Sequence, residues 1–287
     1  MNNTSFERRR FLKSSAFSLI GITTFAYAPG REIYTGTNDY HYNEEPFFYR
    51  YPSTNDALAS GIVGASHGNI DKVKELVTQH PELSGASWDW GFGDWETAIG
   101  AASHVGRRDI AELLISNGAR PDIFTFTMMG MYKSVQEIIE TVPGIQTHAG
   151  PHGITLLQHA KNRLEDKNIS ATDSANVNKV ISYLENLGNA DVKPASLEVT
   201  EDEKQKYIGE YRFGDGEGEI LVVDLNTRKF MQLGRKGSFG RGLRKVGENT
   251  FSPAGAPSVK IIFKMKDDKA ISLSIHEPEP LFTAIKI

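Results

Sequence analysis

The sequence predicts an α+β multidomain protein in which paired helices are followed by an antiparallel β-barrel. Residues 97–119 carry the apolar spacing of two short helices joined by a turn. From Glu203 onward, apolar and polar residues alternate as they do in strands. At 287 residues the chain also exceeds the roughly 100 to 200 residues of one domain. We therefore expect a helical domain and a separate β domain.

The first residues have the pattern of an export signal. The twin-arginine motif is matched by Arg8-Arg9-Arg10-Phe11-Leu12-Lys13, and a run of apolar and small residues follows over 16–28. That run is shorter than the about 20 apolar residues that a membrane-spanning helix needs. We expect residues 1–28 to be a twin-arginine signal peptide that is cleaved after Ala28. Because Pro29 is unfavourable for the peptidase, a cleavage site elsewhere nearby is the alternative. The mature chain is then periplasmic or secreted, without a transmembrane segment.

Composition excludes several kinds of function. The chain has no cysteine, so it has no disulfide framework, thiolate nucleophile or cysteine-bound metal. Its net charge of −4 argues against general affinity for nucleic acids, which need a strongly basic face. The proportions of 39% hydrophobic and 24% charged residues are typical of globular domains.

Residues 29–53 form an aromatic-rich lead-in. Its rings are those of Tyr34, Tyr40, Tyr42, Phe47, Phe48, Tyr49 and Tyr51. Aromatic side chains bury large areas, so we expect part of this segment to cap the first helical pair. A strip of rings that contacts a ligand is the alternative.

Residues 54–195 contain a pattern that recurs around glycines. Gly68, Gly106 and Gly130 are each followed by apolar residues five, eight and nine positions later, which lie on one face of a helix. A degenerate fourth unit starts at Gly153. This pattern resembles the ankyrin repeat, which has a β-turn and two short helices in about 33 residues. The resemblance implies an ankyrin-like α-solenoid, although the spacing of 38 and then 24 residues between the first three glycines is irregular.

Residues 196–287 have the pattern of a β domain. Seven segments are strand-like: 207–213, 219–225, 229–233, 243–246, 260–266, 270–275 and 282–287. Their short connections predict consecutive hairpins that close into a meander barrel or a sandwich. The start Tyr207-Ile208-Gly209-Glu210-Tyr211, with Gly234 and Phe251, resembles the lipocalin-like β domain appended to periplasmic serine hydrolases. The hydrolase half is missing here, so the resemblance implies an accessory role without catalysis.

Two strings match catalytic motifs without the structural context that those motifs need. Residues 64–68 match the Gly-x-Ser-x-Gly nucleophile elbow, but they lie where a helix ends rather than between a strand and a helix. Residues 214–218 are glycine-rich like a phosphate loop, yet they contain two acids and lead into a strand. We expect no catalytic residues, and we predict that the protein is not an enzyme.

Four histidines are the candidate metal ligands. His148, His152 and His159 lie within twelve positions and could gather with His104 around an ion. Their spacing matches no regular ligand pattern, and histidines also cap helices and donate to loop carbonyls. We therefore expect no metal and no cofactor.

The strongest candidate for a binding site is the segment of residues 87–96, which holds all three tryptophans. Alternating rings could form an extended finger beside acids and the start of the next unit. The candidate residues are Trp88, Asp89, Trp90, Phe92, Asp94, Trp95, Ser103, His104, Arg107 and Arg108. The alternative is that these rings seal the joint between the first two units, because tryptophan is mostly buried in proteins.

These patterns favour an exported, non-enzymatic binding or scaffold protein. It would recognise a protein, a peptide or a glycan through the helical repeats. The alternative is a small-ligand-binding or hydrolytic envelope protein that uses the barrel or the cleft between the domains. A deep apolar cavity with converging His and Asp side chains would favour the alternative.

Overall fold

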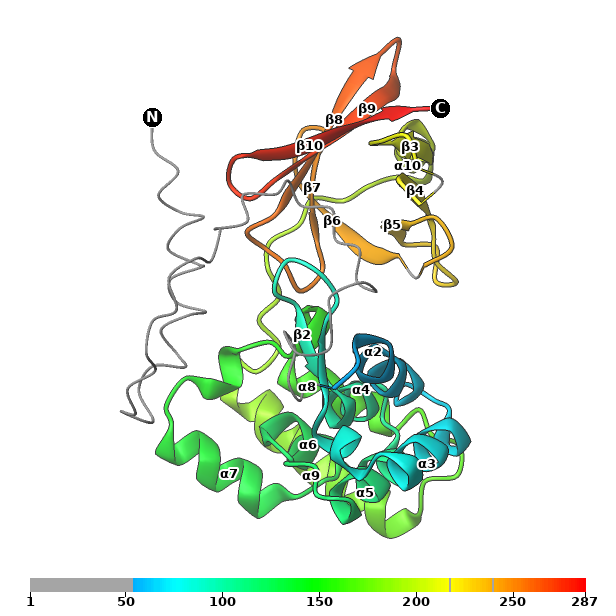
Figure 1. Ribbon diagram of the computed structural model, residues 1–287. Coiled ribbons are helices and arrows are strands. Elements are labelled where there is room, and N and C mark those ends of the chain that lie inside the picture. The colour runs from blue at the N-terminus through cyan, green and yellow to red at the C-terminus, as the bar shows by residue number, and fades with distance from the viewer. Residues whose placement is uncertain (1–53, 217, 239) are drawn as a thin grey trace, which may run out of the picture. The chain divides into compact units, whose positions relative to one another are not determined.

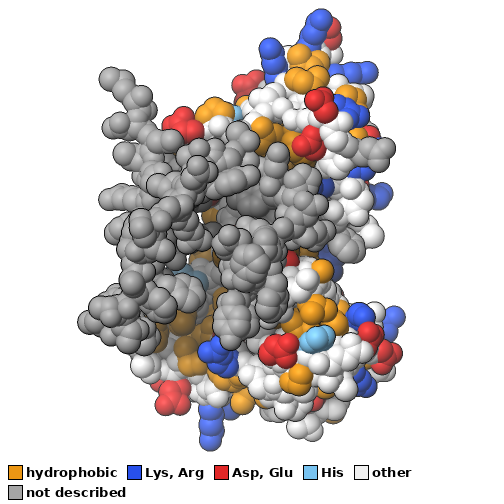
Figure 2. Space-filling view, viewed as in Figure 1, with side chains coloured by type: hydrophobic (Ala, Val, Ile, Leu, Met, Phe, Trp, Pro, Cys, Tyr) orange, Lys and Arg blue, Asp and Glu red, His pale blue; other side chains and the backbone are white. Residues whose placement is uncertain are grey.

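The computed structural model describes residues 54–287 apart from 217 and 239. The expected signal peptide (1–28) and aromatic lead-in (29–53) lie outside the described residues. Among the described helices, none combines the length and the apolar character needed to cross a membrane. On the visible face of this part, acidic and basic side chains are interspersed, in keeping with the small net charge (Figure 2).

Paired helices occupy the first part of the described chain (Figure 1). They are α2 (Asp56–Ala65), α3 (Ile70–Gln79), α4 (Ala98–His104), α5 (Arg108–Ser116), α6 (Ile123–Met128), α7 (Tyr132–Thr141), α8 (Leu156–Arg163) and α9 (Ala171–Leu187). A hairpin of β1 (Ser87–Asp89) and β2 (Trp95–Thr97) precedes α4. Short 3-10 helices connect other elements: η2 (Pro81–Gly85), η3 (Ile145–Thr147) and η4 (Pro151–Gly153).

The buried helix α4 shows why this sequence forms these elements. The Thr97 side chain accepts a hydrogen bond from the backbone N–H of Gly100 and so caps the first turn. Ala98, Ala101 and Ala102 are fully buried, because small side chains let neighbouring helices approach α4 closely. The helix contacts α2, α6 and α8.

The ankyrin-like α-solenoid predicted for residues 54–195 is wrong. In a solenoid each repeat contacts only its neighbours. Here the pair α8–α9 returns to the pair α4–α5: α8 contacts α4, and Arg108 of α5 binds Asp173 of α9 at 2.8 Å. The units are also unequal, since their second helices differ in length: α7 has 10 residues and α9 has 17. The contacts of α8 with α4 and of Arg108 with Asp173 join helical pairs that are distant in the sequence. The periodicity of apolar residues within each helix does not predict them.

The predicted antiparallel β-barrel is confirmed. Its strands are β3 (Gly209–Arg212), β4 (Ile220–Leu225), β5 (Met231–Arg235), β6 (Arg241–Gly247), β7 (Thr250–Pro253), β8 (Lys260–Lys266), β9 (Lys269–His276) and β10 (Pro280–Lys286). Consecutive strands pair, and β10 closes the barrel on β3. The short strand β7 was not predicted. A helix, α10 (Glu201–Tyr207), precedes the barrel.

Aromatic side chains fill part of the barrel core. Tyr207, Tyr211, Phe251 and Phe263 are buried and contact one another. The Tyr211 hydroxyl donates a hydrogen bond to the Tyr207 carbonyl at 2.5 Å, so this buried polar group is satisfied. The alternation of inward and outward residues along these strands is the signal from which the barrel was predicted.

Candidate metal centre

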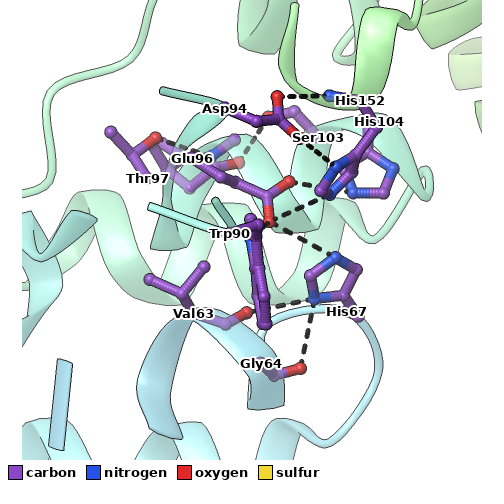
Figure 3. A network of polar contacts seen from close by, with 12 residues as sticks. Val63, Gly64, His67, Trp90, Asp94, Glu96, Thr97, Ser103, His104 and His152 are labelled. Carbon is purple, nitrogen blue, oxygen red and sulfur yellow. Dashed lines mark hydrogen bonds and ion pairs between the residues drawn. The ribbon is translucent and has the colours of Figure 1, made fainter. Parts of the chain in front are cut away.

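Three histidines and one glutamate from separate segments meet beside the β1–β2 hairpin (Figure 3). His67 lies in the turn after α2, Glu96 in β2, His104 at the end of α4 and His152 in η4. One donor atom from each lies within 4.8 Å of the donor atoms of the other three. We call these four residues the His3Glu cluster.

The hairpin points Glu96 into the cluster. Side chains alternate along a strand, and in β2 Glu96 is buried while its neighbours Trp95 and Thr97 are exposed. The indole N–H of Trp90 donates a hydrogen bond to Glu96 Oε2 at 2.7 Å. The carboxylate is therefore held in one orientation, facing the three imidazoles (Figure 3).

The distances in the cluster fit one small cation. Glu96 Oε2 lies 3.4 Å from the Nε2 atoms of both His67 and His152, and Glu96 Oε1 lies 3.0 Å from His104 Nε2. Two ligand atoms bound tetrahedrally to a zinc ion at about 2.0–2.1 Å lie about 3.3 Å from each other. The oxygen–nitrogen separations of 3.0–3.4 Å, which involve both oxygens of Glu96, are close to that value.

Second partners orient two of the imidazoles. His67 Nδ1 lies 3.1 Å from the Val63 carbonyl and 3.2 Å from the Gly64 carbonyl, so Nδ1 carries a proton and donates it there. His152 Nδ1 lies 2.8 Å from Asp94 Oδ2. In both residues Nε2 is left to face Glu96, which is the arrangement that metal-binding histidines commonly have.

The backbone of His152 is held in an uncommon conformation. Its φ is +59°, in the left-handed region that L-residues rarely adopt. Its backbone N–H donates a hydrogen bond to Asp94 Oδ1 at 2.9 Å, in addition to the ring contact. Asp94 thus fixes both the backbone and the ring of His152, and strain maintained in this way is a feature of functional sites.

The buried side of the cluster contains polar atoms without a hydrogen bond. Glu96 and His104 are 1% and 6% exposed. Glu96 Oε1 and His104 Nε2 face each other but are not aligned for a hydrogen bond, and neither has another partner among the described residues. Buried polar atoms are rarely left unpaired, so this pair points to a group that lies between them.

Electrostatics favour a negative Glu96 and a proton on His152. Burial raises the pKa of Glu96, but the neighbouring imidazoles of His104 and His152 lower it by more, so that the pKa lies well below its ordinary value. Burial lowers the pKa of His152, whereas Asp94 and Glu96 raise it, to about 9. The pKa of His67 is lowered, mainly by burial. The cluster therefore attracts positive charge, which a proton or a metal ion can supply.

The donor set selects the class of ion. Three imidazole nitrogens and one carboxylate oxygen suit divalent transition-metal ions such as Zn²⁺, Ni²⁺, Cu²⁺ and Fe²⁺. Mg²⁺ and Ca²⁺ prefer oxygen ligands. The cluster can hold one ion with all four side chains, or with the three histidines and Glu96 close by.

Arg241 of β6 joins the barrel to this region. Its guanidinium group forms an ion pair with the Asp94 carboxylate and donates hydrogen bonds to the carbonyls of Gly91 and Ala254, both at 2.8 Å. A cavity of about 360 Å³ lies beside His67, Trp90, His152 and Arg241.

The predicted site residues are only partly brought together. Trp90, Asp94 and His104 lie in or against the His3Glu cluster. Trp88 and Trp90 pack against the helical core, which is the joint-sealing arrangement. Trp95 is 57% exposed, and Phe92 is exposed as well.

The other candidates lie outside the cluster. Asp89 accepts hydrogen bonds from the backbone of Gly91 and Gly93 within the hairpin loop. The Ser103 hydroxyl donates to the Ile99 carbonyl and contacts Thr125. Arg107 and Arg108 belong to a separate ion-pair network with Asp109, Glu112 and Asp173.

The His3Glu cluster was not predicted from the sequence. His104 and His152 were grouped with His148 and His159 as candidate metal ligands, but not with His67 and Glu96. A signal was present: Ser66-His67 directly follows α2 and Ser103-His104 ends α4, and these are the first helices of two consecutive pairs. In both, the serine hydroxyl bonds the carbonyl four residues earlier. Because His67 and His104 occupy similar positions in neighbouring pairs, their rings lie close together, with a centroid distance of 4.9 Å.

Comparison of the chain with protein-family models, with curated proteins and with solved structures gives no match. The assignment of the site therefore rests on the geometry of this chain alone.

Proposed function

We propose that this protein binds one divalent transition-metal ion through His67, Glu96, His104 and His152. The observation that carries the proposal is the convergence of four donor atoms, one from each side chain, within 4.8 Å of one another, with Glu96 Oε1 and His104 Nε2 buried and not aligned for a hydrogen bond. Two second partners already present the correct nitrogen of His67 and His152.

A purely structural charge network is the competing explanation. In that arrangement a protonated His152 neutralises Glu96, and the cluster only stabilises the fold. It explains the contacts of His152 with both acids. It leaves His104 Nε2 without a hydrogen bond, however, and leaving a buried polar group unpaired is unfavourable by about 1–3 kcal/mol. Metal binding accounts for both atoms.

We further propose that the protein acts outside the cytoplasm, as the twin-arginine pattern of residues 8–13 predicts. That export route carries proteins that have already folded. A centre assembled from four separate segments can then take up its ion before export. A fusion of residues 1–53 to a reporter that must fold before export tests this, with Arg8→Lys/Arg9→Lys/Arg10→Lys as the variant expected to remain in the cytoplasm.

Metal binding is tested with protein purified without a histidine tag and stripped with a chelator. Isothermal titration with Zn²⁺, followed by elemental analysis after dialysis, should give one ion per chain. The variants His67→Ala and His104→Ala should lose this binding, whereas His148→Ala, which changes an exposed histidine outside the cluster, should retain it. Equal binding by all four proteins, or none by the wild type, would refute the proposal. Circular dichroism confirms that each variant is folded.

A further inference from the structure

The His3Glu cluster is buried on one side and open on the other. Glu96 and His104 form the buried side, while the side chains of His67 and His152 are 31% and 26% exposed. These two rings, together with Trp90 and Arg241, line the cavity of about 360 Å³. An ion in the cluster would therefore be enclosed by protein toward Glu96 and accessible from the cavity.

We propose that the cavity receives a small carboxylate with an apolar, planar body, whose carboxylate oxygen reaches the bound ion. This inference rests on the proposed metal centre and adds a class of ligand to it. The volume falls at the lower end of the range of small-molecule sites, about 300–1,000 Å³.

Charge favours an anion. Three neutral imidazoles leave the divalent ion with Glu96 as its one negative ligand, and Asp94 is neutralised by Arg241. The site then carries one net positive charge, which a monocarboxylate balances.

The cavity wall favours an apolar body. The Trp90 ring is fixed by its hydrogen bond to Glu96 and lies 6.2 Å from the His67 ring and 6.3 Å from the His152 ring, measured between centroids. Gly242 and Ala254 supply wall without large side chains. A flat ring beside Trp90 gains apolar contact that acetate cannot make.

The test uses Co²⁺-loaded protein, because the visible absorption of Co²⁺ changes when a ligand is added to the ion. Benzoate is the probe, with benzamide as its neutral counterpart and acetate as the carboxylate without a ring. We expect benzoate to change the spectrum with a Kd at least tenfold lower than that of acetate, and benzamide to have no effect. The absence of a benzoate effect at saturating concentration, or an equal effect of benzamide, would overturn the inference.

A cavity-filling variant locates the binding. A Cβ at Gly242 would meet no atom within 4 Å, so Gly242→Leu has room for its first side-chain atom and fills part of the cavity. It should weaken benzoate at least tenfold and leave Co²⁺ binding unchanged. Gly61→Leu is the matched control, because Gly61 also has free space but lies in α2, outside the cavity lining. Equal benzoate affinity in both variants would place the ligand elsewhere and refute the inference.

The two proposals fail in different ways. If the protein binds no Co²⁺, the metal centre is refuted and the ligand falls with it. If Co²⁺ binds with one ion per chain but benzoate does not change the spectrum, the metal centre stands and only the proposed class of ligand is refuted.

Discussion

Asp94 lies outside the His3Glu cluster but contacts both the backbone and the ring of His152, and it also pairs with Arg241. One carboxylate oxygen accepts a hydrogen bond from the backbone of His152, and the other contacts its ring. The same carboxylate pairs with Arg241, and it is nearly fully buried. Gly255 is required beside it, because a Cβ there would lie 2.5 Å from Asp94 Oδ1.

Asp94→Asn should weaken Zn²⁺ binding about 10- to 100-fold, since removing a partner that orients a ligand has an effect of that size. The amide keeps the volume of the carboxylate but loses the charge that holds His152. Competition against a chromophoric chelator measures the affinity. Asp89→Asn, in the same hairpin but bonded only to loop backbone, should change it less than threefold. Equal losses in the two variants would show that the hairpin, rather than the orientation of His152, is responsible.

At the level of elements, the return of α8–α9 onto α4–α5 defines the helical region. It depends on Gly106, where φ is +75° and a Cβ would lie 2.7 Å from the Asn162 carbonyl oxygen. Asn162 in turn donates a hydrogen bond to the carbonyl of His104 at 2.6 Å. The position of α8 therefore helps to hold His104, one of the proposed metal ligands.

Gly106→Ala should lower the free energy of unfolding by about 2–4 kcal/mol, because left-handed strain and an overpacked contact act together. Gly144→Ala is the control. It has a φ of +93° but nothing within 4 Å of the added Cβ, so only strain of about 1–2 kcal/mol applies. Urea denaturation followed by circular dichroism measures both. A loss in Gly144→Ala as large as that in Gly106→Ala would contradict the importance of the contact with α8.

Sequence patterns could predict the features that are determined by residues close together in the sequence. Strand alternation and short connections were enough for the barrel, and glycines with spaced apolar residues were enough for helical pairs. The return of the fourth pair was not predictable, because it is made by residues such as Arg108 and Asp173, which are 65 positions apart. Trp90, Asp94 and His104 were identified as binding residues for the segment 87–96 and the start of the next unit, whereas the convergence of this segment with His152, more than 50 positions further along the chain, was not predicted.

At the scale of the whole molecule, the proposed ion would connect four segments spread over residues 67–152. An unfolded chain cannot hold these donors together, so the ion binds the native state and stabilises it. At a free concentration 100 times the Kd, the gain is about 2.7 kcal/mol.

Zn²⁺ should therefore raise the thermal midpoint by roughly 5–10 °C for a unit of this size, and a chelator should reverse the rise. Differential scanning calorimetry measures the shift. Mg²⁺ at the same concentration should have no effect, because it prefers oxygen ligands. His104→Ala should unfold at the same temperature with and without Zn²⁺; a shift equal to that of the wild type would mean that Zn²⁺ binds elsewhere.

The most direct measurement is anomalous X-ray diffraction at the zinc edge, from a crystal of the protein loaded with one equivalent of Zn²⁺. We predict a single anomalous peak within about 2.2 Å of Nε2 of His67, His104 and His152 and of a carboxylate oxygen of Glu96. No peak there, or a peak bound to other residues while Glu96 stays paired with a protonated His152, would contradict the proposed metal centre.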